Sequence, residues 1–388
     1  MRKLIALILC LVLAIGVCGS AVTAEENLFK TLLGSETMRI GVLTMLKMPE
    51  EEMEAFSRAQ NLADYLLNLY GYSENVVYAF FPEELTKGVG DGERLSENTG
   101  ALSKEIIYYD RLDEMQMALN ANLIDMIQLY STTARYLCAQ NDNLVCSAAP
   151  TVTDDADKWV MFIATTLKTN DFAFMMLEGK EALRDEFNTA IAAMKEDGTM
   201  DRLIQEQIED LISGAEIAPI ELPVIDGAET VRVAVTGALP PMDYVAADGT
   251  PAGFNTAVLA EISRRINRNI EMVFVDSMSG RSAALASGTV DAVFWTRTNR
   301  RSNLYGDMDE EKQQQTFDKL PEELKPIAKV IMSYVNVSNI GRADMPDGAI
   351  ITEPYFTDWI VTVMARDRYM QLRQIATDFL NAADPDAK

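Results

Sequence analysis

Apolar residues in the second half of the chain form short runs that alternate with a segment of helical spacing. Strand-like runs occupy residues 231–235, 270–275 and 290–295, and a helical pattern begins after Asn255, between the first two runs. Short apolar runs bounded by turn-forming residues are typical of buried strands. Strands that alternate with helices predict an α/β fold in which a mainly parallel sheet is flanked by helices.

The order of residues around these runs occurs twice in the chain. Residues 110–135 align with residues 276–301 at a constant offset of 166 and without a gap, and the matched residues are Asp110 with Asp276, Ala118-Leu119 with Ala284-Leu285, Asp125 with Asp291, Thr132 with Thr298 and Arg135 with Arg301. An apolar strand that begins with Arg precedes the window in both halves, at 39–43 and 232–235. We interpret this pattern as an internal duplication.

Several matched positions predict backbone structure rather than chemistry. Asn122 and Gly288 both lie between a short helix and a strand, where a left-handed conformation is easiest for these two residue types. Asp125 and Asp291 enter the strand that follows. We expect their carboxylates to accept hydrogen bonds in the turn rather than to act as catalytic acids.

Turn-forming residues divide the chain almost evenly. Apolar residues at helical spacing end near Leu211-Ile212, and the next segment contains Gly214, Pro219, Pro223 and Gly227. We therefore predict a first module at residues 38–212, a linker at 213–229 and a second module at 230–388.

The first 24 residues have the pattern of a secretory signal peptide. A basic tripeptide is followed by an almost wholly apolar segment at 4–17, which is shorter than the roughly 20 residues needed to span a bilayer. We predict cleavage after Ala24 and export to the periplasm or the cell surface. Lipidation at Cys18 is the alternative, but Val17 stands where that processing requires Gly, Ala or Ser.

The acidic composition excludes several kinds of partner. The formal net charge is -25, so nucleic acid and anionic membrane surfaces would repel the chain. The acidic clusters at 154–157 and 307–311 lack the ligand spacing of an EF-hand loop. The chain contains no histidine, which removes His-dependent triads and His zinc sites. We therefore predict no metal and no cofactor.

Two cysteines remain after the predicted cleavage, Cys138 and Cys146. An exported pair eight residues apart can form a disulfide that closes a small loop. Two buried thiols are the alternative interpretation.

Short motifs accompany the strands of the second half, and they are Pro240-Pro241, Gly253-Phe254-Asn255, Ala284-Leu285, Ser287-Gly288-x-x-Asp291 and Thr298-x-x-Arg301. In this order they resemble the extracellular solute-binding proteins, family 3, of amino-acid ABC importers. Residues 181–207 of the first half resemble the closing helices of the same family. The resemblance implies the type II periplasmic-binding-protein fold, in which two lobes are joined by a two-strand hinge and the ligand lies between them.

Each half of the chain passes from one strand almost directly to its closing helices, so each half resembles a single lobe. The chain is thus identified as two tandem shortened copies. In one arrangement the two modules face each other across 213–229 and make one cleft, so that ligand binding closes the halves by hinge motion. In the other, each module is an independent unit.

The resemblance also supplies candidate ligand-binding residues, which are Tyr244, Trp295, Thr296, Thr298, Arg301 and Arg135. The guanidinium of Arg301 suits a carboxylate, because its planar fork donates two charge-assisted hydrogen bonds. The aromatic rings would cover the apolar part of a small ligand. Arg135 has the same position in the first half, where we expect a degenerate site.

The predicted function is capture of a small carboxylate-bearing, amino-acid-like ligand outside the cytoplasm and its delivery to an ABC permease in the membrane. The alternative is a ligand-free adaptor or surface interaction protein built from degenerate lobes. The sequence contains no nucleophile–base pair, metal-ligand cluster, phosphate loop or dinucleotide fingerprint. We therefore expect a binding protein rather than an enzyme.

Overall fold

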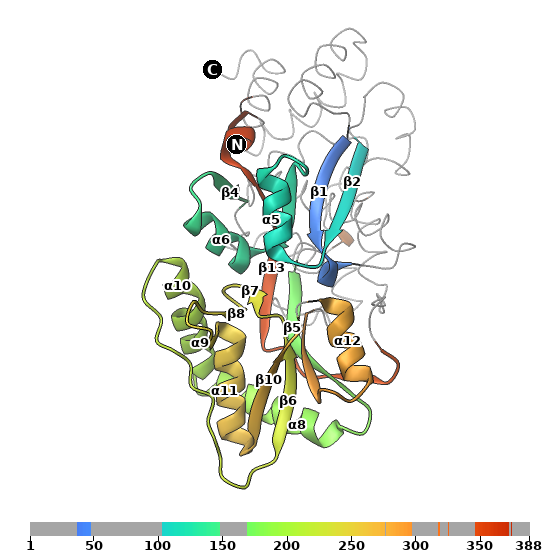
Figure 1. Ribbon diagram of the computed structural model, residues 1–388, viewed down its shortest axis with the longest axis vertical. Coiled ribbons are helices and arrows are strands. Elements are labelled where there is room, and N and C mark those ends of the chain that lie inside the picture. Colours follow the sequence, from blue (N-terminus) through green and yellow to red (C-terminus); the bar gives the residue numbers. More distant parts are fainter. Residues whose placement is uncertain are drawn as a thin grey trace.

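The computed structural model has two lobes that share one sheet (Figure 1). It describes residues 37–47, 103–147, 169–275, 277–296, 317–318, 325, 346–371 and 374. The predicted signal peptide, its lipidation alternative, Thr298 and Arg301 lie outside these residues. Within the described ranges no helix is both long enough and apolar enough to cross a membrane.

The first lobe is built on three parallel strands in the order β2–β1–β3. Its elements are β1 (Thr37–Leu43), η1 (Thr44–Leu46), β2 (Ser103–Tyr109), α5 (Leu112–Asn120), β3 (Met126–Tyr130), α6 (Ser131–Gln140) and β4 (Leu144–Cys146). Gly41 lets the sheet pack closely, because a Cβ atom there would lie 2.6 Å from Cδ1 of Ile124 and 3.0 Å from Cγ of Met115 on α5.

The second lobe repeats this order with the parallel strands β10–β6–β11. Its elements are β6 (Thr230–Val235), β7 (Ala238–Leu239), β8 (Asp243–Val245), β9 (Pro251–Ala252), α11 (Phe254–Ile266), β10 (Asn269–Phe274), α12 (Met278–Ala286), β11 (Ala292–Thr296) and β12 (Ala349–Ile351). Strands β7, β8 and β9 form a separate small sheet. The predicted α/β architecture, with mainly parallel strands in each lobe and flanking helices, is confirmed.

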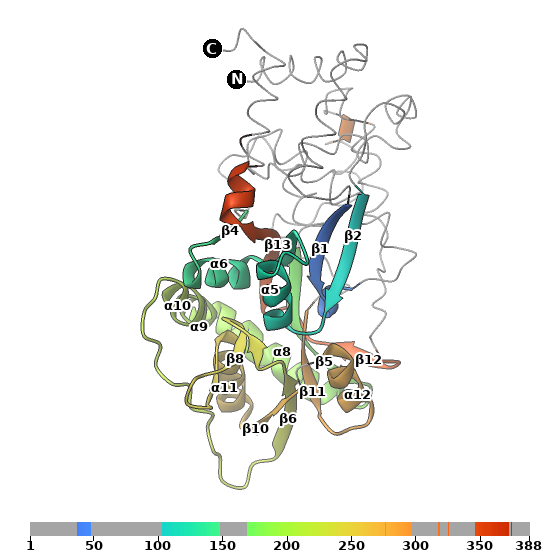
Figure 2. The same cartoon turned by 45° about the horizontal axis from the view of Figure 1, so that its top comes forward.

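Two long strands connect the lobes, and Figures 1 and 2 show them at the centre of the molecule. They are β5 (Thr169–Leu177) and β13 (Phe356–Ala365), and they pair antiparallel from Phe356 with Phe172 to Trp359 with Thr169. Strand β5 then continues along β11 of the second lobe, and β13 continues along β3 of the first. We call the segments 169–172 and 356–359 the hinge.

Aromatic side chains fill the core around the hinge. The ring of Phe172 lies 5.0 Å from that of Tyr130, 5.3 Å from that of Phe294 and 5.7 Å from that of Phe356, measured between centroids. These four rings come from β3, β5, β11 and β13. The short distances between these rings show that the hinge lies in packed core rather than in a loose connection. Each such aromatic pair adds about 0.5–1.5 kcal/mol of stability beyond burial.

The helices that follow β5 pack on the second lobe, although they precede the predicted linker in the sequence. They are α8 (Glu181–Glu196), α9 (Thr199–Ile204), the π-helical turn η5 (Gln205–Glu209) and α10 (Asp210–Ile212). Arg268 of the second lobe donates 2.7 Å from Nε to the Glu186 carboxylate of α8, and Arg265 pairs with Asp197 at 2.8 Å.

The predicted division at residues 213–229 therefore does not coincide with the division between the lobes. Each half of the sequence gives its last described strand to the sheet of the other lobe. The physical reason is that β3 pairs with β1 along one edge, and β11 pairs with β6 along one edge, so that each strand has a second edge to cover. The antiparallel strand that covers this second edge comes from the opposite half of the chain.

The two lobes nevertheless share local geometry at the predicted offset. Helices α5 and α12, and strands β3 and β11, are each displaced by 166 residues. Asn122 has φ 56° and Gly288 has φ 71°, which confirms the predicted left-handed conformation at both positions. This correspondence supports the duplication, which stays an interpretation.

Asp125 and Asp291 occupy equivalent turns and have the predicted structural role. The backbone N–H of Asp125 donates to the carbonyl of Arg39 at 2.8 Å, and the N–H of Arg39 donates back to the Asp125 carboxylate at 2.8 Å. Asp291 and Arg232 exchange the same two bonds at 2.8 and 2.9 Å. Each aspartate thus ties the start of its third strand to the first strand.

Candidate functional site

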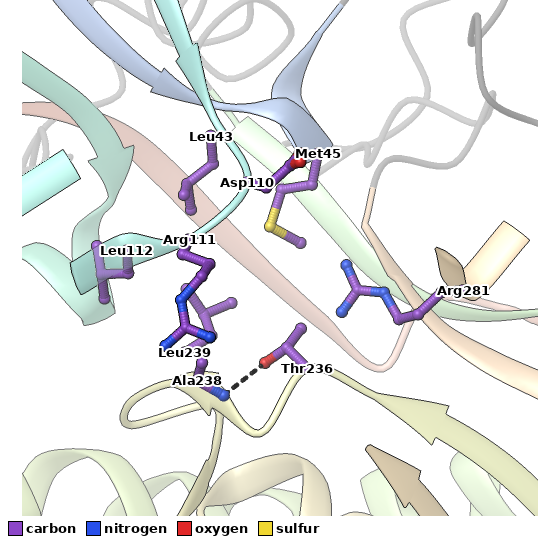
Figure 3. Close-up of a pocket in the computed structure, with 9 residues that line it drawn as sticks. All are labelled: Leu43, Met45, Asp110, Arg111, Leu112, Thr236, Ala238, Leu239 and Arg281. Carbon is purple, nitrogen blue, oxygen red and sulfur yellow. Dashed lines mark hydrogen bonds between the residues drawn. The ribbon is translucent and has the colours of Figure 1, made fainter. Parts of the chain in front are cut away.

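A crevice lies between the lobes, at the carboxyl ends of their parallel strands (Figure 3). The residues that line it end β1, follow β1, β2 or β6, or lie on α12, and they are Leu43, Met45, Asp110, Arg111, Leu112, Thr236, Ala238, Leu239 and Arg281. Ligands of open α/β sheets bind outside the carboxyl ends of the strands, because the connecting loops leave a depression there. The crevice is therefore the candidate site.

The crevice is nearly closed in this conformation. Its volume is about 20 Å³, which is room for about one water molecule. Pockets that hold small-molecule ligands measure roughly 300–1,000 Å³. The crevice as it stands is therefore too small for an amino acid, and the two hinge strands are the connection between the lobes that flank it.

Arg281 is the cationic residue of the second-lobe wall. It is 2% exposed, and Figure 3 shows its guanidinium pointing into the space between Met45 and Thr236. The rest of α12, with the sequence MSGRSAALA, has small or apolar side chains. Burying a guanidinium is costly unless nearby charge or hydrogen bonds compensate, so the surroundings of Arg281 matter.

Asp243 is a buried acidic residue that interacts electrostatically with Arg281. This carboxylate is 1% exposed and accepts hydrogen bonds from the Thr236 hydroxyl and from the Gly237 N–H at 2.5 Å. Burial raises the pKa of Asp243, while the hydrogen bond from Thr236 and the charge of Arg281 act in the opposite direction. Thr236 therefore contacts both the crevice and the buried carboxylate.

The polar network continues from Asp243 toward the hinge. Asn255, at the start of α11, donates from Nδ2 to Asp243 at 3.4 Å, and the Tyr355 hydroxyl donates to Oδ1 of Asn255. All three residues are buried, and burial raises the pKa of Tyr355 well above its usual value. Tyr355 directly precedes β13, so the network connects the crevice wall to a hinge strand.

The first-lobe wall carries both signs of charge. Arg111 donates two hydrogen bonds to the carboxylate of Asp113, at 3.0 and 2.8 Å. The hydrogen bond from Arg111 lowers the pKa of Asp113. Asp110 lines the crevice beside Arg111 and is exposed. A carboxylate on the first lobe thus lies across the crevice from a guanidinium on the second.

None of the predicted ligand-binding residues that the structure describes is among the residues that line this crevice. Tyr244 lies on β8, and burial raises its pKa. Trp295 and Thr296 end β11, where their backbones pair with Ala173 and Phe172; their side chains lie outside the described part of the structure.

Arg135 lies on α6 and is engaged with a different element. Its Nη1 donates to Oε1 of Glu209 at 2.9 Å, and its Nη2 donates to Oε2. This hydrogen bonding raises the pKa of Arg135 and lowers that of Glu209. Arg135 is therefore part of a bidentate ion pair with Glu209, and it does not line the crevice.

Cys138 on α6 and Cys146 on β4 are free, half-buried thiols. Their side chains are hydrogen-bonded to each other, which raises the pKa of Cys138 and lowers that of Cys146 to about 7. The predicted disulfide stays a prediction, although the structure brings the two sulfur atoms together.

Arg281 was not among the residues predicted from the sequence. The duplication could not identify it, because the residue at the equivalent position in the first lobe is the apolar Met115. A usable signal was present, since Arg281 is the one charged residue in the segment 278–286. Among the described residues, no group of three or more Cys, Asp or Glu side chains is placed to hold a metal ion.

Residues 231–315 match the family model of the bacterial extracellular solute-binding proteins, family 3. This match confirms the predicted resemblance for a segment of the second half. It covers less than half of the chain, and the interpretation as two tandem copies stays a prediction. The matched family consists of binding proteins rather than enzymes. No curated protein sequence matches.

Three similar solved structures illustrate the structural comparison. The ligand-binding component of an ABC-type import system from Staphylococcus aureus, with zinc bound, is 10% identical over 90% of this chain and 72% of that chain, with a TM-score of 0.34. A periplasmic binding protein from Brucella ovis with glutathione bound is 10% identical over 89% and 68%, with a TM-score of 0.36. The BvgS VFT2 domain of Bordetella pertussis is 13% identical over 94% and 97%, with a TM-score of 0.32. Scores below 0.5 do not by themselves establish a shared fold.

Proposed function

Because residues 231–315 match the extracellular solute-binding proteins of family 3, we propose that the chain is an extracytoplasmic solute-binding protein. It captures a small carboxylate-bearing, amino-acid-like ligand between its two lobes and delivers it to an ABC permease in the membrane. The observation that carries this proposal is the crevice, which is lined by a buried guanidinium of one lobe and by a carboxylate of the other.

The charges of the crevice suit a zwitterion. Arg281 can donate two charge-assisted hydrogen bonds to a ligand carboxylate. Asp110 on the opposite wall can accept hydrogen bonds from a ligand ammonium group. A ligand that contacts both lobes stabilises the closed arrangement relative to the open one, by the free energy of the contacts that it makes only in the closed arrangement.

The segment that contains the other candidate residues begins at the same edge of the sheet. Strands β6 and β11 are parallel, so the chain leaves β11 on the side where Thr236 follows β6. We propose that Thr296, Thr298 and Arg301, with Tyr244 and Trp295, extend the ligand site from this edge. The exported location and the cleavage after Ala24 belong to the same proposal.

Ligand-induced stabilisation tests the proposal. The chain from residue 25 onward would be heated with single amino acids, short peptides and dicarboxylates. A ligand present at about 100 times its Kd adds about 2.7 kcal/mol to the free energy of unfolding, which raises the Tm by a few degrees. We expect at least one zwitterionic ligand to do this, and Arg281→Ala to abolish the shift.

Arg184→Ala is the matched control. Arg184 forms an exposed ion pair with Asp185 on α8 of the second lobe, away from the crevice lining. Its variant should keep the full ligand-induced shift. If no compound changes the Tm, and the Arg281→Ala profile is the same as that of the unchanged chain, the second candidate function is favoured.

That second candidate is a ligand-free adaptor or surface interaction protein. The observation in its favour is the crevice volume of about 20 Å³, which is too small for an amino acid unless the lobes separate. Such a protein would keep the lobes closed in all conditions, whereas a receptor must open to admit its ligand.

A further inference from the structure

Arg135 and Glu209 belong to different lobes. Helix α6 follows β3 of the first lobe and packs against β4 and β13. The turn η5 packs against α11 of the second lobe, where Ile208 is fully buried. In Figures 1 and 2, α6 lies beside α10, the helix that continues η5. The ion pair therefore crosses the boundary between the lobes.

Both partners of the ion pair lie on anchored elements, α6 on the hinge strand β13 and η5 on the second lobe. At its start, α6 is fixed by the Asp358 carboxylate, which accepts from the backbone N–H of Thr132 at 3.0 Å and from the Thr132 hydroxyl. On the other side, η5 packs against α11 through the fully buried side chain of Ile208. If the lobes separate, neither partner can follow the other without breaking these contacts.

We propose that the Arg135–Glu209 ion pair is a latch that sets how often the crevice opens. This inference concerns the regulation of the proposed ligand site and rests on the proposed function for its biological role. The two guanidinium–carboxylate bonds can form only when the lobes are close, so they stabilise the closed arrangement and leave the open one unchanged.

The latch is weak enough to break repeatedly. The side chains of Arg135 and Glu209 are 40% and 37% exposed, so water and salt screen their attraction. Exposed ion pairs change an equilibrium by about 1.5- to 5-fold. A contact of this strength biases the lobes toward closure without preventing a ligand from entering.

The test measures lobe opening in the absence of any ligand. Spin labels would be attached at Asn120→Cys on α5 and Glu271→Cys on β10, which are exposed positions on different lobes. Cys138 and Cys146 would be replaced by Ser, and the chain would start at residue 25. Electron–electron distance measurements at 0.05 M salt then give the ratio of long to short distances.

The parent is the spin-labelled chain with the two Cys→Ser replacements. We expect Arg135→Ala and Glu209→Ala each to raise the open fraction by about 1.5- to 5-fold relative to this parent. The double charge exchange Arg135→Glu with Glu209→Arg should restore the parent distribution. Salt at 1 M should open the parent and leave the single variants unchanged, because it screens only an existing attraction.

Arg202→Ala is the control, because Arg202 pairs with Glu206 and Glu261 within the second lobe. It should leave the distance distribution unchanged. If an alanine variant unfolds, Glu209→Gln removes the charge with the smallest change of shape and should give the same opening.

An unchanged distribution in folded Glu209→Gln, or a charge exchange that opens the lobes as much as the single variants, would overturn the latch. Because no ligand is used, this result is independent of the proposed function. If the distance measurements confirm the latch but no compound of the ligand panel stabilises the chain, only the ligand proposal is overturned.

Discussion

At the scale of single residues, Asp358 shows how burial and hydrogen bonding compete. It is a hinge residue, 5% exposed, that accepts two hydrogen bonds from Thr132 and one from the backbone N–H of Trp359. Burial raises its pKa to about 6, because removal of water from the charged form outweighs these bonds. The folded chain therefore binds more protons than the unfolded chain between about pH 4 and pH 6.

The sign of the effect follows from this difference. Stability contributed by Asp358 is present below its unfolded pKa and is lost as the pH rises through about 6. We expect Asp358→Asn to raise the free energy of unfolding at pH 7.5 by up to about 3 kcal/mol, and by under about 1 kcal/mol at pH 4. Urea unfolding at both pH values measures this.

Asp201→Asn, an exposed substitution on α9, serves as the comparison. It should change the free energy of unfolding by less than about 0.5 kcal/mol at either pH. An Asp358→Asn variant that is equally destabilised at pH 4 and pH 7.5 would show that the carboxylate is held charged by its hydrogen bonds.

At the scale of elements, α6 and β4 can be joined covalently. The hydrogen bond from Cys138 and, to a smaller extent, the charge of Arg135 lower the pKa of Cys146 to about 7, which favours the thiolate, the reactive form of a cysteine. With glutathione disulfide as oxidant, the two thiols would lose two protons and two electrons, form one S–S bond and release two glutathione molecules.

We expect oxidation to remove both titratable thiols from the chain that starts at residue 25. The cross-link should raise the free energy of unfolding by about 2–3 kcal/mol, because it closes a short loop in the unfolded chain. Thiol titration, mass measurement and urea unfolding check this, with Cys146→Ser as the control. Two thiols that stay titratable after exposure to the oxidant would contradict the prediction.

At the scale of the whole molecule, the exchange of strands makes the two halves interdependent. The first half lacks β13, which covers β3, and its own β5 needs β11 of the second half. We expect fragments 25–212 and 213–388 to be unfolded when expressed separately, because each would expose an unpaired sheet edge and the apolar face of its helices.

Mixing the fragments should restore a folded complex, since every strand then finds its partner. Circular dichroism of each fragment and of the mixture, together with co-purification through a tag on one fragment, provides the measurement. Two fragments that melt cooperatively on their own would instead favour independent modules.

Much of the local structure followed from the sequence. Strand β6 begins at Thr230 where the pattern predicted residue 231, and the turns at Asn122 and Gly288 are left-handed as predicted. These features depend on neighbours close in sequence, such as apolar spacing and the steric freedom of Asn and Gly. The match of residues 231–315 to the solute-binding family likewise reflects a contiguous pattern.

The sequence by itself thus determined the main strands of the second lobe, the mainly parallel character of the sheet and the structural role of Asp125 and Asp291. Only the tertiary structure decided that β5 and β13 exchange lobes and that Arg281 lies in the crevice opposite Asp110. The physical reason is that an apolar pattern specifies which face of a strand is buried but not which edge it pairs with. A side chain such as Arg281 acquires its role only when a distant segment is placed against it.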